Sequence, residues 1–213
     1  MRPKTIVFDL DGTLVDSLPD ISNSFRYGFA KLGLPVPDAT AVRAEIGKPL
    51  EEMYASFAPA EQVAALCACY REHYPQHFTD QTRPYPGVLE LLAQLRQAGF
   101  KTAVATTKQS FMATRLLTAL GLVALIDHIQ GTDGFPHKPA PDVILRALAA
   151  VGGDGLWMVG DTVSDIAAGK AAGLKTYAVS WGTHDAATLA SAHPDVLATT
   201  LTPLLELTAL SQK

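Results

Sequence analysis

The sequence has few cysteines, and this shortage excludes two kinds of cross-linked structure. Cys67 and Cys69 are the only two in a chain of 213 residues. They fall in a run that looks helical, where residues at this spacing point to different faces. The arrangement suits neither a zinc site, which needs further ligands, nor an unstrained disulfide. We therefore predict that both thiols are free and buried or half-buried.

An excess of positive charge and a long apolar run are also missing. The 17 lysines and arginines are outnumbered by 21 aspartates and glutamates, which gives a formal net charge of -4. A protein with this balance has no basic field that follows a nucleic-acid backbone. No apolar segment follows a basic leader or approaches the roughly 20 residues that span a bilayer. The sequence thus predicts a cytoplasmic protein that binds neither nucleic acid nor membrane, and it leaves the oligomeric state open.

What is present is the composition of an ordinary globular protein, with 48% hydrophobic and 18% charged residues. Strand-like and helix-like runs alternate along most of the chain. The expected strands are 5–8, 101–106, 127–130, 156–159, 175–179 and 195–198, and the expected helices of the same pattern are 88–98, 109–120, 142–151, 163–172 and one from 202. This alternation predicts an α/β fold, a doubly wound parallel sheet with a Rossmann-like core.

One part of the chain departs from the alternation. A helix is expected at 17–33, and from there to about residue 82 no convincing strand follows. Further helices are expected at 39–46, 49–57 and 59–78, separated by proline-containing turns. An all-helical block between a first strand and later α/β units indicates an insertion. We predict a catalytic core of residues 1–15 and 83–213, with residues 16–82 as an inserted all-helical cap.

The first strand ends in two acids. Asp9 follows the apolar run directly, Asp11 comes two positions later, and Gly12 allows a sharp turn. Because ligands of parallel α/β sheets bind beyond the carboxyl ends of the strands, both acids should face that crevice. Two carboxylates forced together repel, and such a pair usually holds a cation or divides into an acid and a base. Taken alone, the segment is also compatible with two acids that cap a turn.

Polar residues follow later strands in the same way. The complete set is Asp9, Asp11, Thr106, Lys138, Asp161 and Asp165. Since parallel strands all finish at one edge of the sheet, these side chains should meet in one crevice. Several carboxylates beside one lysine and one hydroxyl form an oxygen-rich site that suits Mg²⁺ better than zinc.

Each of the later residues also has a purely structural explanation. Thr106 can be an ordinary strand end, and Lys138 can be a solvated loop lysine. Asp161 can cap a turn, and Asp165 can be a first-turn acid favoured by the helix dipole. The prediction of a site therefore depends on all of them arriving in order at strand ends.

These segments resemble the motifs of the haloacid dehalogenase-like hydrolases. The matching segments are 9–17, the strand that ends in Thr106, 138–142 and 160–165. The resemblance covers nearly the whole chain. The helical insertion after the first motif, the Tyr85-Pro86-Gly87 re-entry and the stretch 179–182 resemble the phosphoglycolate phosphatase-like group.

The resemblance implies a role for each catalytic residue. Asp9 would be the nucleophile that forms an aspartyl-phosphate. Asp11 would protonate the leaving alcohol and later deprotonate the attacking water. Thr106 would hydrogen-bond the transferring phosphoryl oxygens, and Lys138 would hold their charge.

The resemblance also implies a metal site. Asp9, the backbone carbonyl of Asp11 and Asp161 would bind magnesium, and Asp165 would complete or orient this set of ligands. The ion would let Asp9 stay ionised beside the other carboxylates.

Substrate contacts are expected from Gly12, Thr107 and Lys48. Thr107 stands where relatives often have asparagine, and its backbone amide is the expected contact. Lys48, in the turn Gly47-Lys48-Pro49, lies where relatives place a specificity loop and would contact a carboxylate or a second phosphate. The alternative is a solvated turn lysine.

The implied function is a magnesium-dependent phosphatase for a small phosphorylated metabolite, phosphoglycolate-like, that acts through an aspartyl-phosphate. Two alternatives stay open, a phosphomutase of the β-phosphoglucomutase type and a non-catalytic phosphate-binding protein on the same scaffold. Segment 16–20 lacks the threonine, histidine and basic residues usual in the mutases, and the intact set of Asp9, Asp11, Lys138 and Asp161 argues against a pure binder.

Overall fold

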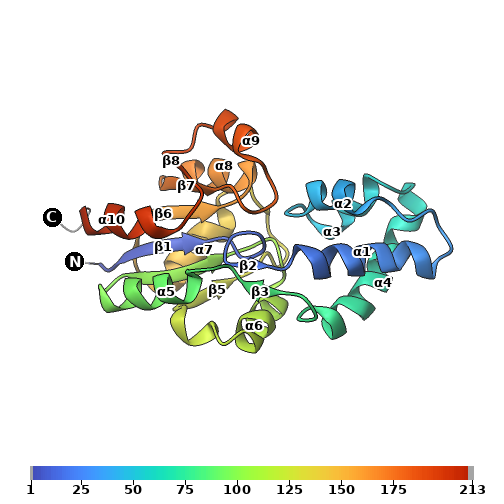
Figure 1. Cartoon of the computed structure of the whole chain (residues 1–213), viewed down its shortest axis with the longest axis horizontal. Helices are drawn as coiled ribbons and strands as arrows, with labels where there is room; N and C mark the ends of the chain where they lie inside the picture. Colours follow the sequence, from blue (N-terminus) through green and yellow to red (C-terminus); the bar gives the residue numbers. More distant parts are fainter. Residues whose placement is uncertain (1, 211–213) are drawn as a thin grey trace.

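A six-stranded parallel sheet forms the centre of the molecule, as described for residues 2–210 by a computed structural model (Figure 1). In spatial order the strands are β5 (His128–Gln130), β4 (Lys101–Ala105), β1 (Lys4–Phe8), β6 (Asp154–Gly160), β7 (Lys175–Val179) and β8 (Val196–Ala198). All neighbouring pairs are parallel. The predicted fold class, a doubly wound parallel α/β sheet, is confirmed.

Strand β1 ends in the apolar run 6–8, which helices cover on both faces. Ile6 and Phe8 pack in one hydrophobic cluster with α5 (Val88–Gln97), α6 (Ser110–Ala119) and α10 (Thr202–Leu210). Val7 points to the opposite face and packs with α7 (Asp142–Val151) and α8 (Val163–Ala171). A strand buried in this way needs a continuous apolar run, not an alternating one.

A separate helical unit lies beyond the carboxyl ends of the strands (Figure 1). Its helices are α1 (Leu18–Lys31), α2 (Ala39–Glu45), α3 (Leu50–Ala55) and α4 (Ala60–His77). They bury their own hydrophobic cluster, in which the rings of Phe25 and Tyr54 stack with centroids 4.0 Å apart. The helices fall where the sequence predicted them, and the cap boundary at residues 16–82 stays a prediction.

A short antiparallel ribbon joins the two parts. Strand β2 (Val15–Asp16) carries the chain toward the helical unit, and β3 (Arg83–Pro84) carries it back. Val15 pairs with Pro84 and Asp16 with Arg83. The ribbon was not predicted, because its strands are too short to show a periodic pattern.

Two further short elements also escaped prediction, α9 (Ala186–Ser191) and the 3-10 helix η1 (Val123–Leu125). Cys67 and Cys69 are both free and buried, as predicted. No helix within residues 2–210 is long and apolar enough to cross a bilayer.

Candidate active site

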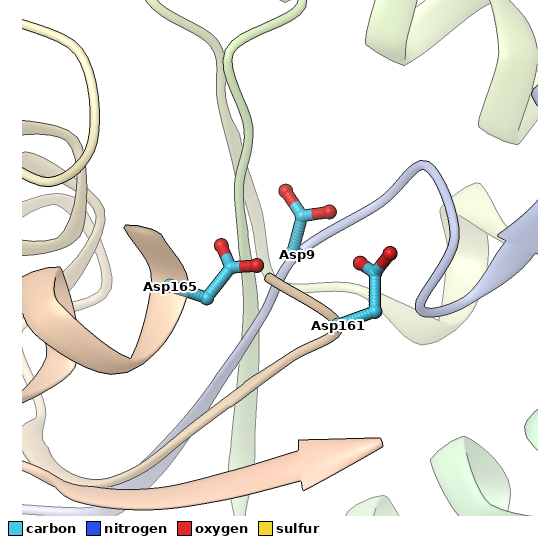
Figure 2. Close-up of side chains that lie close together, drawn as sticks. All are labelled: Asp9, Asp161 and Asp165. Carbon is cyan, nitrogen blue, oxygen red and sulfur yellow. The ribbon is translucent and has the colours of Figure 1, made fainter. Parts of the chain in front are cut away.

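Three acids meet where the central strands end. Asp9 follows β1, while Asp161 and Asp165 follow the neighbouring β6 (Figure 2). One carboxylate oxygen of each lies within 4.8 Å of the others, and all three side chains are buried. The sheet therefore brings together acids that are more than 150 positions apart in sequence.

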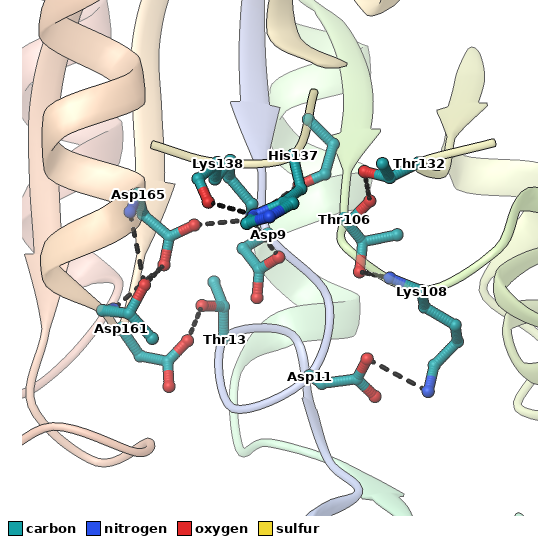
Figure 3. A network of polar contacts seen from close by, with 12 residues as sticks. Asp9, Asp11, Thr13, Thr106, Lys108, Thr132, His137, Lys138, Asp161 and Asp165 are labelled. Atoms are coloured by element: carbon teal, nitrogen blue, oxygen red, sulfur yellow. Dashed lines mark hydrogen bonds and ion pairs between the residues drawn. The ribbon is translucent and has the colours of Figure 1, made fainter. Parts of the chain in front are cut away.

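Lys138 places a positive charge against this acid cluster (Figure 3). Its Nζ lies 2.5 Å from Asp9 Oδ1 and 2.5 Å from Asp165 Oδ1, and it donates to the carbonyl of Ala105 at 3.0 Å. Burial disfavours the ammonium, but the carboxylates of Asp165 and Asp9 outweigh it and raise the pKa of Lys138 above its usual range. Lys138 is therefore a buried cation and not the solvated loop lysine of the structural alternative.

The acid cluster is still short of positive charge. Burial raises the pKa of Asp9 well above its ordinary value of 3.8, although Lys138 opposes the rise. Burial, together with the charge of Asp165, raises the pKa of Asp161 to about 6. Three buried carboxylates face one lysine, so the cluster favours a bound cation.

Asp161 is held by hydrogen bonds from two loops. The hydroxyl of Thr13 donates to its Oδ1 at 2.8 Å, and the backbone N–H of Thr183 donates to its Oδ2 at 2.7 Å. Two glycines make room for the carboxylate, because a Cβ at Gly12 or Gly182 would lie 2.3 or 2.2 Å from Oδ2. Gly12 also has a φ of +86°, which disfavours other residues.

Gly12 thus lies against Asp161, and its predicted contact with substrate stays a prediction.

Asp165 uses both of its oxygens on the protein. Oδ2 accepts from the backbone N–H of Thr162 at 2.9 Å and from its hydroxyl at 2.7 Å, and Oδ1 accepts from Lys138. The backbone N–H of Asp165 in turn donates to Oγ1 of Thr162 at 3.2 Å, which completes a capping box that begins α8. Asp165 therefore orients Lys138 while it starts the helix.

The end of β4 supplies a hydroxyl. Thr106 is buried, and its Oγ1 accepts from the backbone N–H of Lys108 at 3.2 Å. Both Thr106 and the half-buried Thr107 line the cavity next to Asp9. The structure thus places both predicted threonines beside the acid cluster.

Asp11 lies apart from the acid cluster and has a partner that the sequence analysis missed. Its Oδ1 accepts from the hydroxyl of Ser17 at 2.5 Å, and its Oδ2 lies 3.1 Å from Nζ of Lys108. The contact of Lys108 with Asp11 is seen in Figure 3. Lys108 also donates to the hydroxyl of Tyr74 in α4 at 2.9 Å, so it links the site to the helical unit. Its position two residues after Thr106, at the same strand end, was the available signal.

A cavity of about 610 Å³ opens between the strand ends and the helical unit, and Asp9, Asp11, Lys138 and Asp165 all line it. Lys48 also lies on the wall of this cavity. Its side chain is about half exposed, and its Nζ lies 2.7 Å from Glu45 Oε2.

The donor set fits magnesium. Every acidic donor in the cluster is a carboxylate oxygen, and the glycine cradle holds one of these carboxylates in place. A hard divalent cation with oxygen ligands suits such a set, whereas zinc prefers nitrogen and sulfur donors.

Comparisons with known proteins agree with this geometry. A family model described as haloacid dehalogenase-like hydrolase matches residues 6–179. A probable phosphatase, IndB, of Dickeya dadantii is 37% identical over 96% of this chain and 93% of that protein. A phosphoglycolate phosphatase of Caulobacter vibrioides is 38% identical over 84% of this chain and 79% of that protein. The solved structure of a haloacid dehalogenase-like family hydrolase from Streptococcus pneumoniae superposes with a TM-score of 0.89 at 31% identity, covering 97% of this chain and 98% of that one.

Proposed function

The chain belongs to the haloacid dehalogenase-like hydrolase family and is a phosphatase of its phosphoglycolate phosphatase-like group, and from this premise we propose that it hydrolyses a small phosphomonoester with magnesium. The observation that carries the proposal is the buried contact of Lys138 with Asp9 at 2.5 Å, beside Asp161 and Asp165. A carboxylate nucleophile, a fixed cation and a further carboxylate pair are groups that serve phosphoryl transfer through an aspartyl-phosphate.

Asp9 is the proposed nucleophile and Asp11 the proposed acid and base. An oxygen of Asp9 bonds to phosphorus while the bond from phosphorus to the alcohol oxygen breaks, and Asp11 gives its proton to that oxygen. Water then attacks phosphorus and gives a proton to Asp11, the bond from phosphorus to Asp9 breaks, and inorganic phosphate leaves. Ser17, 2.5 Å from Asp11, fixes the acid for both steps.

Lys138 and Thr106 would hold the phosphoryl group. The ammonium of Lys138 neutralises charge on the transferring oxygens, and the hydroxyl of Thr106 donates to one of them. Asp165 keeps Lys138 in place through their 2.5 Å contact. These groups are fixed before substrate arrives, which lowers the cost of organising the transition state.

Asp9, Asp161 and the backbone carbonyl of Asp11 would hold the magnesium ion, with Asp165 orienting this set. When bound, the ion would supply positive charge to the phosphoryl oxygens and to the carboxylates. The raised pKa of Asp9 and of Asp161 supports this assignment, because burial and the neighbouring carboxylates disfavour their ionised forms, which a bound cation would stabilise.

The helical unit is proposed to act as the cap that covers the cavity and excludes water. Lys48 of the helical unit and Thr107 at the end of β4, both on the cavity wall, are the proposed substrate contacts. The relatives named above suggest phosphoglycolate as one substrate to test. The cytoplasmic location and the absence of nucleic-acid and membrane partners stay predictions.

Replacing the nucleophile tests the proposal. Asp9→Asn should abolish release of 4-nitrophenol from 4-nitrophenyl phosphate in Mg²⁺, and EDTA should do the same to the native protein. Asp154→Asn, at the exposed beginning of β6, is the matched control and should retain activity. Circular dichroism would verify that both variants are folded. Retained turnover in Asp9→Asn would contradict the mechanism, and absence of turnover in the native protein would favour a binding role.

A further inference from the structure

The cavity wall opposite the acid cluster is largely apolar. The side chains that form it include Ile21, Met53, Tyr70, Tyr74, Phe111 and Met112. They come from α1, α3 and α4 of the helical unit and from the first turn of α6. Phe111 is 57% exposed, which is unusual for a large aromatic side chain, and its exposed surface borders this cavity.

The lysines and arginines that line the cavity are already paired. Within residues 2–210, the lysines and arginines that line the cavity form the pairs Lys48–Glu45, Arg71–Glu51, Lys108–Asp11 and Lys138 with both Asp9 and Asp165. A second anionic group on a substrate would have to compete with one of these carboxylates and would lie near the others. The wall therefore offers more to an uncharged group than to an anion.

The volume of the cavity also favours an alcohol larger than glycolate. Its volume of about 610 Å³ lies within the range of roughly 300–1,000 Å³ that is typical of cavities for drug-sized ligands. Glycolate is a two-carbon acid and would leave most of this space to water. A larger alcohol with an apolar group would fill the space and cover Phe111, Tyr70 and Met53.

We propose that this site selects phosphomonoesters of alcohols that carry an uncharged apolar group, an aromatic ring above all, over esters of short anionic alcohols such as phosphoglycolate. The inference rests on the proposed function, in which the phosphoryl group occupies the end of the site at Asp9 and Lys138. The alcohol then extends along the apolar wall, where the rings of Phe111, Tyr70 and Tyr74 lie within its reach.

Three esters with similar primary leaving alcohols test the inference, namely 2-phenylethyl phosphate, ethyl phosphate and phosphoglycolate. We expect kcat/KM, measured by phosphate release in Mg²⁺, to be about tenfold or more higher for 2-phenylethyl phosphate than for the other two. A higher kcat/KM for phosphoglycolate, or equal values for 2-phenylethyl and ethyl phosphate, would overturn the inference while leaving the proposed function intact. No release from any ester, with 4-nitrophenyl phosphate included, would overturn both.

A variant at the exposed ring tests where the alcohol lies. Phe111→Ser should lower the preference for 2-phenylethyl over ethyl phosphate by about threefold or more, because part of the apolar contact is lost. Leu89→Ser is the matched control, since Leu89 is also an exposed apolar side chain, 45% exposed, and lies on α5 away from the cavity wall. An unchanged preference in Phe111→Ser would contradict this placement, as would an equal loss in the control.

Discussion

The end of the sheet and the helical unit face the same cavity with opposite surfaces. On the sheet side, buried acids and Lys138 are fixed by strand ends and by hydrogen bonds from neighbouring loops. On the helical side, the wall is apolar, and its charged residues form pairs that are partly exposed. The difference suggests that the sheet carries the chemistry, whereas the helical unit, together with Phe111 of α6, chooses the alcohol.

Several contacts between the two parts are polar. Arg43 donates to the carbonyl of Gly182 at 3.1 Å, Arg115 donates to that of Pro75 at 3.2 Å, and His137 lies 3.1 Å from Glu52. The two parts have distinct hydrophobic clusters, which meet at Met112 of α6, packed with the helices, and at Phe78, packed against both clusters. Such an interface can open at modest cost, which a cap requires.

The largest effect should come from the charge of the sheet side. Lys138→Met should lower kcat/KM for 4-nitrophenyl phosphate about 10³-fold or more, because the transferring oxygens lose their fixed cation. It should also lower the free energy of unfolding by about 3–5 kcal/mol, since buried carboxylates lose their partner. Urea unfolding measures the second effect, and Lys4→Met, at the exposed beginning of β1, is the control. A variant with full activity would show that Lys138 is only structural.

Metal binding should stabilise the sheet side in a pH-dependent way. At pH 7.5, Mg²⁺ at about 100 times its Kd should add about 2.7 kcal/mol, or roughly 5–10 °C in Tm. The pKa of Asp161 is raised to about 6 from 3.8 on folding, so in the metal-free protein its stabilising contribution is fully present below about 3.8 and is lost as the pH rises through about 6.

The gain in Tm from Mg²⁺ should therefore shrink as the pH falls through about 6, where protons compete for Asp161. Differential scanning fluorimetry with and without Mg²⁺, from pH 5 to pH 8, measures it. A gain that grows toward low pH would contradict the assigned ligands.

Lys108 stands between the two regions, and its loss should have an intermediate effect. Lys108→Met should lower kcat about tenfold with little change in KM, because Asp11 loses one of its two positioning contacts. Tyr74→Phe is the matched variant, since it keeps the ring 4.7 Å from Nζ and removes only the hydroxyl that accepts from Lys108. We expect it to change kcat by less than about threefold. Equal losses of kcat in Lys108→Met and Tyr74→Phe would show that the effect comes from the contact of Lys108 with Tyr74 and not from the positioning of Asp11.

The smallest effect is expected on the helical side. Lys48→Ala should raise KM for phosphoglycolate by less than about fivefold, since a half-exposed ion pair is worth about 0.2–1 kcal/mol. KM for 2-phenylethyl phosphate should change less. Equal changes for the two esters would show that Lys48 does not contact the distal group.

The same contrast explains what the sequence could predict. Asp9, Thr106 and Asp161 follow apolar runs directly, so the geometry of a parallel sheet was enough to place them together. Lys108 was missed because its partners, Asp11 and Tyr74, come from other segments of the chain. The sequence around Lys108 does not show that these side chains lie within contact distance of it.

The apolar wall was unpredictable for the same reason. Tyr70 and Phe111 come from helices of different units, and they border one cavity only because of how those units pack. The short helix α9 was missed because Asp185, its N-cap, precedes a segment with a single buried apolar side chain, Leu189.

The antiparallel pairing of Val15 with Pro84 holds the two ends of the helical insertion next to each other. The chain leaves the sheet and returns to it at adjacent points, so a different insert could be spliced between residues 16 and 83 while the strand ends keep their positions. Exchange of this segment between related proteins would replace the part of the apolar wall that the helical unit supplies, while Phe111 and the catalytic groups stay in place. In evolution or in design, replacement of this one segment would therefore change the substrate preference without rebuilding the catalytic site.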